Sequence, residues 1–183
     1  MTKLSFQDFV TAKASEVEEA ARAEKAIDWN KEKQDWITHL QRLKTDVTKW
    51  LDPYSETIQV STKTIPLSEE LLGTYSAPMT VITIGKDAVN LEPIGTLLIG
   101  SRGRVDIKGP KGTARLVLVP MSSTGIRVHV EVLVKGQKPN SATADRPPFS
   151  EWVWKLVIPP PANKFVELTE DSFQEVLMRV VNG

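Results

Sequence analysis

The hydrophobic pattern of the chain changes its period near Pro53, and this change limits the folds that it can adopt. Residues 1–52 contain neither glycine nor proline and are rich in Ala, Glu, Lys and Gln, which favour helices. From Thr57 onward, apolar and polar residues alternate in short runs bounded by Gly, Pro, Asn, Asp or Ser, a pattern typical of strands. The sequence therefore predicts an α+β fold, with a helical segment over residues 1–52 and an antiparallel sheet with a C-terminal helix over residues 57–183. We expect the two parts to form one compact domain.

The helical segment carries two apolar stripes that are out of register with each other. The first stripe contains Val10, Ala14, Val17 and Ala21, with Phe6 and Phe9 one turn earlier, and the second contains Trp29, Trp36, Leu40, Leu43, Val47 and Trp50. One straight helix cannot hold both stripes on one face, so the pattern predicts either two helices or one helix with a phase break. The shift falls in the polar stretch 26–35, where Asp28 or Asn30 is a suitable N-cap.

The strand-length runs after Thr57 are joined by short connections, which indicate antiparallel neighbours. We expect a meander of five to seven strands. The clearest alternation covers residues 126–135, and a single helical turn capped by Ser68 is expected between the first two strands. The polar, proline-containing stretch 135–150 predicts a long loop, which is either a lid over a site or a disordered segment.

The chain ends in a segment with the signals of an amphipathic helix. Thr169 is a suitable N-cap, and Glu170 and Asp171 follow it at the positive end of the helix dipole. The apolar face of this helix is expected to contain Phe173, Val176, Leu177 and Val180.

A stretch of four glycines and five basic residues, "GSRGRVDIKGPKGTARLVLV" at residues 100–119, raises the question of a phosphate loop. Such a loop gathers its glycines in one turn at the start of a helix, whereas here strand-like runs separate the glycines and no helical pattern follows. We therefore interpret the glycines as turn residues. Gly103 is expected to adopt a positive φ in a three-residue hairpin, and Pro110 is expected to lie in the next turn.

The basic residues of this region define a candidate anion-binding face. It comprises Arg102, Arg104, Lys108, Lys111, Arg115, Arg127 and His129. The alternative is a solvated sheet face whose charges prevent edge-to-edge pairing. Binding to nucleic acid is the less favoured interpretation, because the 23 basic and 23 acidic residues give no net charge and the face lacks exposed aromatic side chains for stacking.

The residues needed for catalysis or metal binding are sparse. The chain contains no cysteine and two histidines, of which His39 is expected on a helix surface. His129 shares a strand face with Glu131, so a hydrolase-like enzyme that uses His129 is a weaker alternative. We predict no catalytic residue, no metal site and no cofactor.

The apolar stripes lead to the prediction about partners. The tryptophan stripe matches a sheet face with Trp152, Trp154 and Leu156, whereas the first stripe has no obvious cover. Phe6, Val10 and Val17 are therefore the candidate self-association residues, and a homodimer is expected.

No run of about 18 apolar residues suggests a membrane span, and the lack of cysteine fits the cytoplasm. The leading hypothesis is a soluble binding or assembly module without an evident catalytic site. Its alternative is a binder of nucleic acid or anionic ligands.

Overall fold

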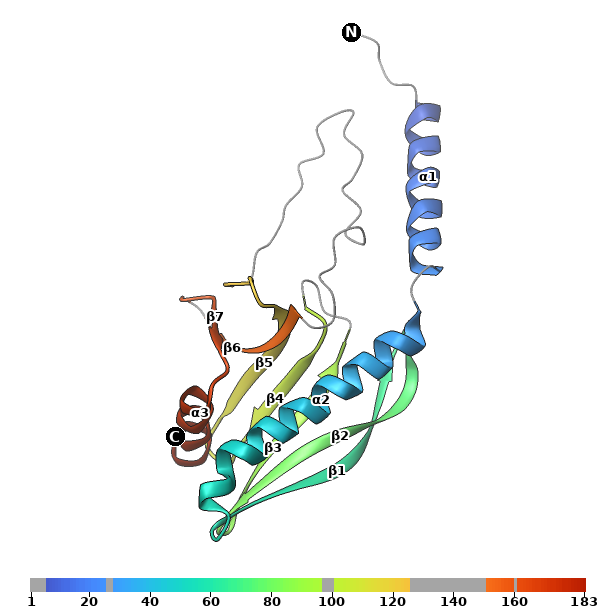
Figure 1. Cartoon of the computed structure of the whole chain (residues 1–183). Helices are drawn as coiled ribbons and strands as arrows, with labels where there is room; N and C mark the ends of the chain where they lie inside the picture. Colours follow the sequence, from blue (N-terminus) through green and yellow to red (C-terminus); the bar gives the residue numbers. More distant parts are fainter. Residues whose placement is uncertain (1–5, 26–27, 97–100, 126–150, 160) are drawn as a thin grey trace.

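The expected α+β architecture is confirmed by a computed structural model, which describes residues 6–25, 28–96, 101–125, 151–159 and 161–183 (Figure 1). The helices are α1 (Phe6–Lys25), α2 (Trp29–Leu51), the short 3₁₀ helix η1 (Asp52–Tyr54) and α3 (Glu170–Asn182). The strands are β1 (Ile58–Glu69), β2 (Gly73–Ile84), β3 (Asp87–Gly95), β4 (Arg104–Lys108), β5 (Thr113–Pro120), β6 (Trp152–Ile158) and β7 (Lys164–Glu167). The strand expected over residues 126–135 and the loop expected over 135–150 lie outside the described residues.

The seven strands form one sheet in chain order, and every neighbouring pair is antiparallel. The predicted meander is therefore confirmed. The helical turn expected with Ser68 as its cap is wrong, because residues 66–69 continue β1 and Ser68 lies opposite Thr74 of β2. The long β1–β2 ladder supplies the backbone hydrogen bonds that an isolated helical turn would leave partly unmade.

Helix α2 lies across one face of the sheet (Figure 1), and its tryptophan stripe packs against that face. Trp36, Leu40, Leu43 and Val47 are buried in the core. The Trp36 ring lies 5.9 Å from that of Trp154 on β6, and the Trp154 indole N–H donates to the His39 carbonyl at 3.2 Å. Burial of a large apolar side chain contributes about 2 kcal/mol, so the buried side chains of α2 together hold this helix on the sheet. The expectation that Trp152, Trp154 and Leu156 belong to the core is confirmed.

The boundaries of the helices agree with their capping residues. The N-terminal segment forms two helices, and the Asp28 side chain caps α2 by accepting from the Lys31 amide at 3.1 Å. Thr169 caps α3 in a capping box with Ser172. Phe173, Val176, Leu177 and Val180 form the buried face of α3, as the sequence predicts.

Two glycines of the glycine-rich stretch allow helices to approach the sheet. Gly103 lacks the expected positive φ; a Cβ at this position would lie 2.1 Å from the Trp36 ring. The expected hairpin role is therefore wrong, and Gly103 makes room for the tryptophan of α2. Gly109, in the β4–β5 turn, would place a Cβ 2.3 Å from the Val180 carbonyl oxygen of α3. That oxygen accepts from the Lys111 amide at 2.9 Å, so the turn caps the end of α3.

The two glycines of the β4–β5 turn provide a matched test of this close approach. Gly109→Ala should lower the free energy of unfolding by about 2 kcal/mol, because the new methyl group overlaps backbone atoms of α3. Gly112→Ala places its Cβ 3.8 Å from Val180, an ordinary contact, and should change stability by less than about 0.5 kcal/mol. Urea denaturation of the two variants measures the difference, and equal stability would contradict the proposed role of Gly109.

Candidate functional site

Three basic residues of the predicted anion-binding face lie on the sheet face opposite the helices, where acidic partners accompany them. Arg104 makes two hydrogen bonds to the carboxylate of Asp106, both at 2.7 Å. Arg115, on the neighbouring strand, lies 3.8 Å from the same carboxylate. The hydrogen bonds from Arg104 to Asp106 raise the pKa of the Arg104 guanidinium above its ordinary value. Lys108 forms an ion pair with Glu92 of β3 at 2.7 Å.

The remaining members of the predicted face lie elsewhere. Arg102 points to the helix side and bonds Glu32 of α2, while Lys111 lies in the β4–β5 turn. Arg127 and His129 lie outside the described residues. The structure thus brings together Arg104, Lys108 and Arg115, with Asp106 and Glu92 between them. The anion-binding face stays a prediction, and carboxylates already occupy much of its hydrogen-bonding capacity.

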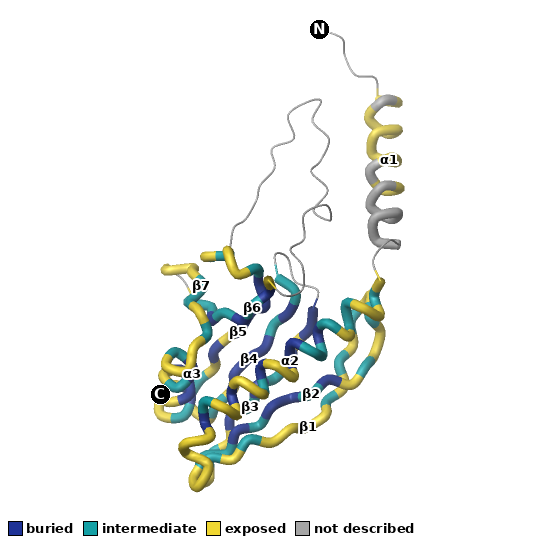
Figure 2. The backbone as a smooth tube through the Cα atoms, viewed as in Figure 1, coloured by how far each residue is buried: buried dark blue, intermediate teal, exposed yellow. Residues whose placement is uncertain are grey.

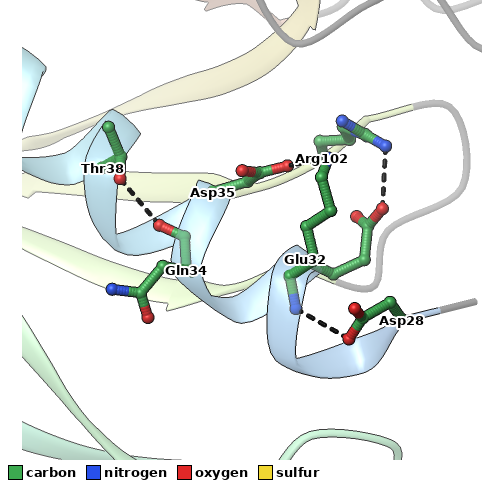
Figure 3. Close-up of polar contacts among 7 residues, drawn as sticks. Asp28, Glu32, Gln34, Asp35, Thr38 and Arg102 are labelled. Carbon is green, nitrogen blue, oxygen red and sulfur yellow. Dashed lines mark hydrogen bonds and ion pairs between the residues drawn. The ribbon is translucent and has the colours of Figure 1, made fainter.

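A polar cluster links the first turns of α2 to the residues before β4 (Figure 3). The Arg102 guanidinium donates to Glu32 at 2.9 Å and lies 4.9 Å from the centre of the Trp152 ring. Asp35 and His39 follow Glu32 at helical spacing on the same side of α2. The cavity between Glu32, Asp35, Trp36, His39, Arg102 and Leu118 has a volume of about 10 Å³. This space is suited to about one water molecule and excludes any organic substrate.

His39 is the functional candidate whose environment the sequence did not reveal. The side chain is 4 % exposed, so the expectation of a helix-surface histidine is wrong. Burial, followed by the positive charge of Arg42, lowers the pKa of His39 from its ordinary value of 6.5 to about 4. A proton therefore binds His39 only in acid, which makes it a poor general base at neutral pH. Among the described residues, no group of three or more His, Asp or Glu side chains is placed to bind a metal ion.

The low pKa of His39 predicts a loss of stability in weak acid. Between pH 6.5 and pH 4 the unfolded chain binds a proton at this residue and the folded protein does not, so stability falls as the pH falls through that window. From pH 7 to pH 5 the loss from His39 is about 2 kcal/mol. His39→Gln should remove this part of the pH dependence, and His129→Gln should keep it. Urea denaturation at both pH values tests this, and parallel losses in wild type and His39→Gln would contradict it.

A half-buried carboxylate holds three segments of the fold together. Glu69, at the end of β1, accepts hydrogen bonds from the Tyr75 hydroxyl and from the amide and hydroxyl of Thr96, the latter two at 2.8 and 2.9 Å. Burial, together with the hydrogen bond to Glu69, raises the pKa of the Tyr75 hydroxyl above its ordinary value. These contacts tie the β1–β2 hairpin to the end of β3. Sequence reasoning missed them because the three residues come from separate segments and share no motif.

Helix α1 carries the most exposed apolar side chains of the described residues. Figures 1 and 2 show this helix projecting from the body of the protein beyond the first turn of α2. Phe6, Phe9, Val10 and Val17 are 80, 53, 48 and 69 % exposed. Three of them are the predicted self-association residues, and Phe9 is an addition, its ring 6.3 Å from that of Phe6. The other described residues leave this stripe exposed.

A second apolar surface lies at the opposite end of α2. Here a groove of about 500 Å³ opens between the end of α2, the turn η1, the β2–β3 hairpin and α3. Its apolar lining includes Leu51, Tyr54, Ile58, Ile84, Met178 and Val181. Tyr54 and Met178 are 50 and 60 % exposed, and the carboxylate of Asp87 lies at the wall. The volume falls in the range of sites that accept small ligands or side chains of a partner. We refer to it as the α2–α3 groove.

No protein-family model, curated protein sequence or solved structure matches this chain. No helix among the described residues is both long enough and apolar enough to cross a membrane. The candidate functional surfaces are therefore the two apolar ones, the stripe of α1 and the α2–α3 groove.

Proposed function

We propose that this protein is a non-enzymatic assembly module that forms a homodimer through α1. The observation that carries the proposal is the exposure of Phe6, Phe9, Val10 and Val17 on a helix that projects from the rest of the protein. Such a contiguous apolar surface is characteristic of an interaction site. The lack of cysteine fits a cytoplasmic location for this dimer.

The chain offers α1 no apolar cover along its neighbour α2. The buried stripe of α2 is already used against the sheet. The face of α2 turned away from the sheet carries Gln34, Thr38, Gln41, Thr45 and Thr48. The three threonine hydroxyls donate to backbone carbonyls one turn earlier, at 2.8 to 3.0 Å. A polar surface of this kind gives little hydrophobic stabilisation to the phenylalanines of α1, so a second chain is the better partner.

The ion pairs on the outer sheet face favour assembly over anion binding. Arg104 and Lys108 already contact Asp106 and Glu92 at 2.7 Å, so an incoming phosphate would have to displace these carboxylates. The low pKa and tight packing of His39 likewise weaken a catalytic proposal based on the described residues. Self-association needs no rearrangement of either group.

Sedimentation equilibrium tests the proposed dimer directly. Wild type should give a mass of about 41 kDa, twice the chain mass of 20.4 kDa. The triple variant Phe6→Ser, Val10→Ser, Val17→Ser should give the monomer mass, because it removes the large apolar groups at the proposed interface.

The matched control places three serines on α1 outside the apolar stripe, at Thr11, Ala12 and Glu18. This variant loses more helix propensity than the first, because Ala and Glu are better helix formers than Phe and Val, and it should nevertheless remain dimeric. Circular dichroism and urea denaturation should show an intact core in both variants, since α1 lies outside the core cluster. A monomeric wild type at 200 µM would overturn the proposed function.

A further inference from the structure

The large side chains of α1 are concentrated in one turn. Phe6, Phe9 and Val10 occupy positions i, i+3 and i+4, and all three are about half exposed or more. The stripe then narrows to Ala14 and Val17. A long helix–helix seam needs a large side chain in every turn, whereas an amphipathic helix that binds a groove presents its anchors at i, i+3 and i+4. The distribution on α1 is of the second kind.

The α2–α3 groove has the properties that such an anchor requires. Leu51, Ile58 and Ile84 form its floor, while Tyr54 and Met178 are the exposed apolar groups at its rim. A volume of about 500 Å³ accommodates a pair of aromatic side chains. Because α1 and this groove are both apolar and both open to solvent, burying one against the other removes two unfavourable surfaces at once.

The direction of α1 carries its apolar end away from the groove of its own chain. The groove begins at Leu51, the last residue of α2, whereas α1 precedes the first residue of α2 and projects away from the body (Figure 1). At 1.5 Å per residue the 23 residues of α2 span about 34 Å and the 20 residues of α1 about 30 Å. The Phe6 end of α1 would reach the groove of its own chain only if α1 reversed its direction and lay back along the whole of α2. A second chain can receive α1 in the direction that the structure gives it.

We propose that the Phe6–Phe9–Val10 end of α1 binds in the α2–α3 groove of a second copy, and that the second copy returns the contact. The result is a closed twofold dimer with two identical α1–groove contacts, an exchange of one element between protomers. This inference rests on the proposed self-association through α1. What is new is the surface that receives α1, namely the α2–α3 groove of the second copy.

Methyl NMR of methionine-labelled protein gives a reporter in the groove and controls outside it. The chain has four methionines, among which Met178 lines the groove, while Met121 is exposed on another loop and Met79 is buried in β2. The Met178 methyl signal should shift between dilute and concentrated wild type, and the Met79 and Met121 signals should stay. In the Phe6/Val10/Val17 triple serine variant, the Met178 signal should not depend on concentration.

A groove variant and a matched surface variant separate the modes of dimerisation. Tyr54→Glu with Met178→Glu places two charges at exposed groove positions and should weaken dimerisation at least about a hundredfold. Leu71→Glu with Met121→Glu changes two exposed apolar residues elsewhere and should leave the dimer unchanged. Because all four positions are exposed, both double variants should keep the fold of wild type, which circular dichroism checks.

Complementation is the decisive measurement. The labelled triple serine variant keeps an intact groove, and the unlabelled groove variant keeps an intact α1. Mixing them should shift the Met178 methyl signal of the labelled chain, because one of the two contacts can form. Adding unlabelled triple serine variant should produce no shift.

The outcomes separate failure of this inference from failure of the proposed function. A monomeric wild type overturns both. A dimeric groove variant, or an unshifted Met178 signal in the mixture, overturns the groove as the receiving surface. In that case, loss of the dimer in the triple serine variant still supports self-association through α1.

Discussion

The packing of Trp36 against the sheet is the contact on which the arrangement of the other elements depends. Its ring fills the space left by the missing side chain of Gly103 and lies beside Trp154 of β6. One residue of α2 thereby contacts the residue before β4 and a residue of β6, which lie far apart in the sequence. Together with Leu40, Leu43 and Val47, this contact holds α2 across the sheet, and α1 emerges beyond the first turn of α2 (Figure 1).

Because α2 buries its apolar face against the sheet, its packing also determines which apolar surfaces of the protein remain exposed. Because Leu40, Leu43 and Val47 all pack inward, the outward face of α2 is polar and offers α1 little apolar surface. At the other end, Trp50 stacks with Phe173 of α3 at 5.6 Å, which fixes where the two helices meet. The α2–α3 groove lies where they separate from the β2–β3 hairpin. The two exposed apolar surfaces are thus consequences of the same packing.

Periodicity and capping were sufficient to predict most of the fold. The two stripes and Asp28 indicated two helices, and Thr169 indicated where α3 begins, because these signals act within one or two helical turns. The errors concern contacts between distant residues. The sequence around Gly103 describes a turn equally well, since only the position of Trp36 shows why a Cβ is excluded. His39 has the pattern of a surface residue until the segment at Arg102 is placed over it.

The candidate site follows the same division between local and distant information. The exposed stripe of α1 could be predicted from the sequence because it lies on a single helix, although Phe9 was not among the candidate self-association residues. The α2–α3 groove was not, because its walls come from α2, η1, the β2–β3 hairpin and α3, and none of these carries a distinctive motif. Wall residues such as Leu51, Ile58 and Ile84 also have the pattern of ordinary core positions in their own elements. A groove of this kind arises where neighbouring apolar faces diverge, so its location is a property of the packing angle between helices and cannot be read from any one segment.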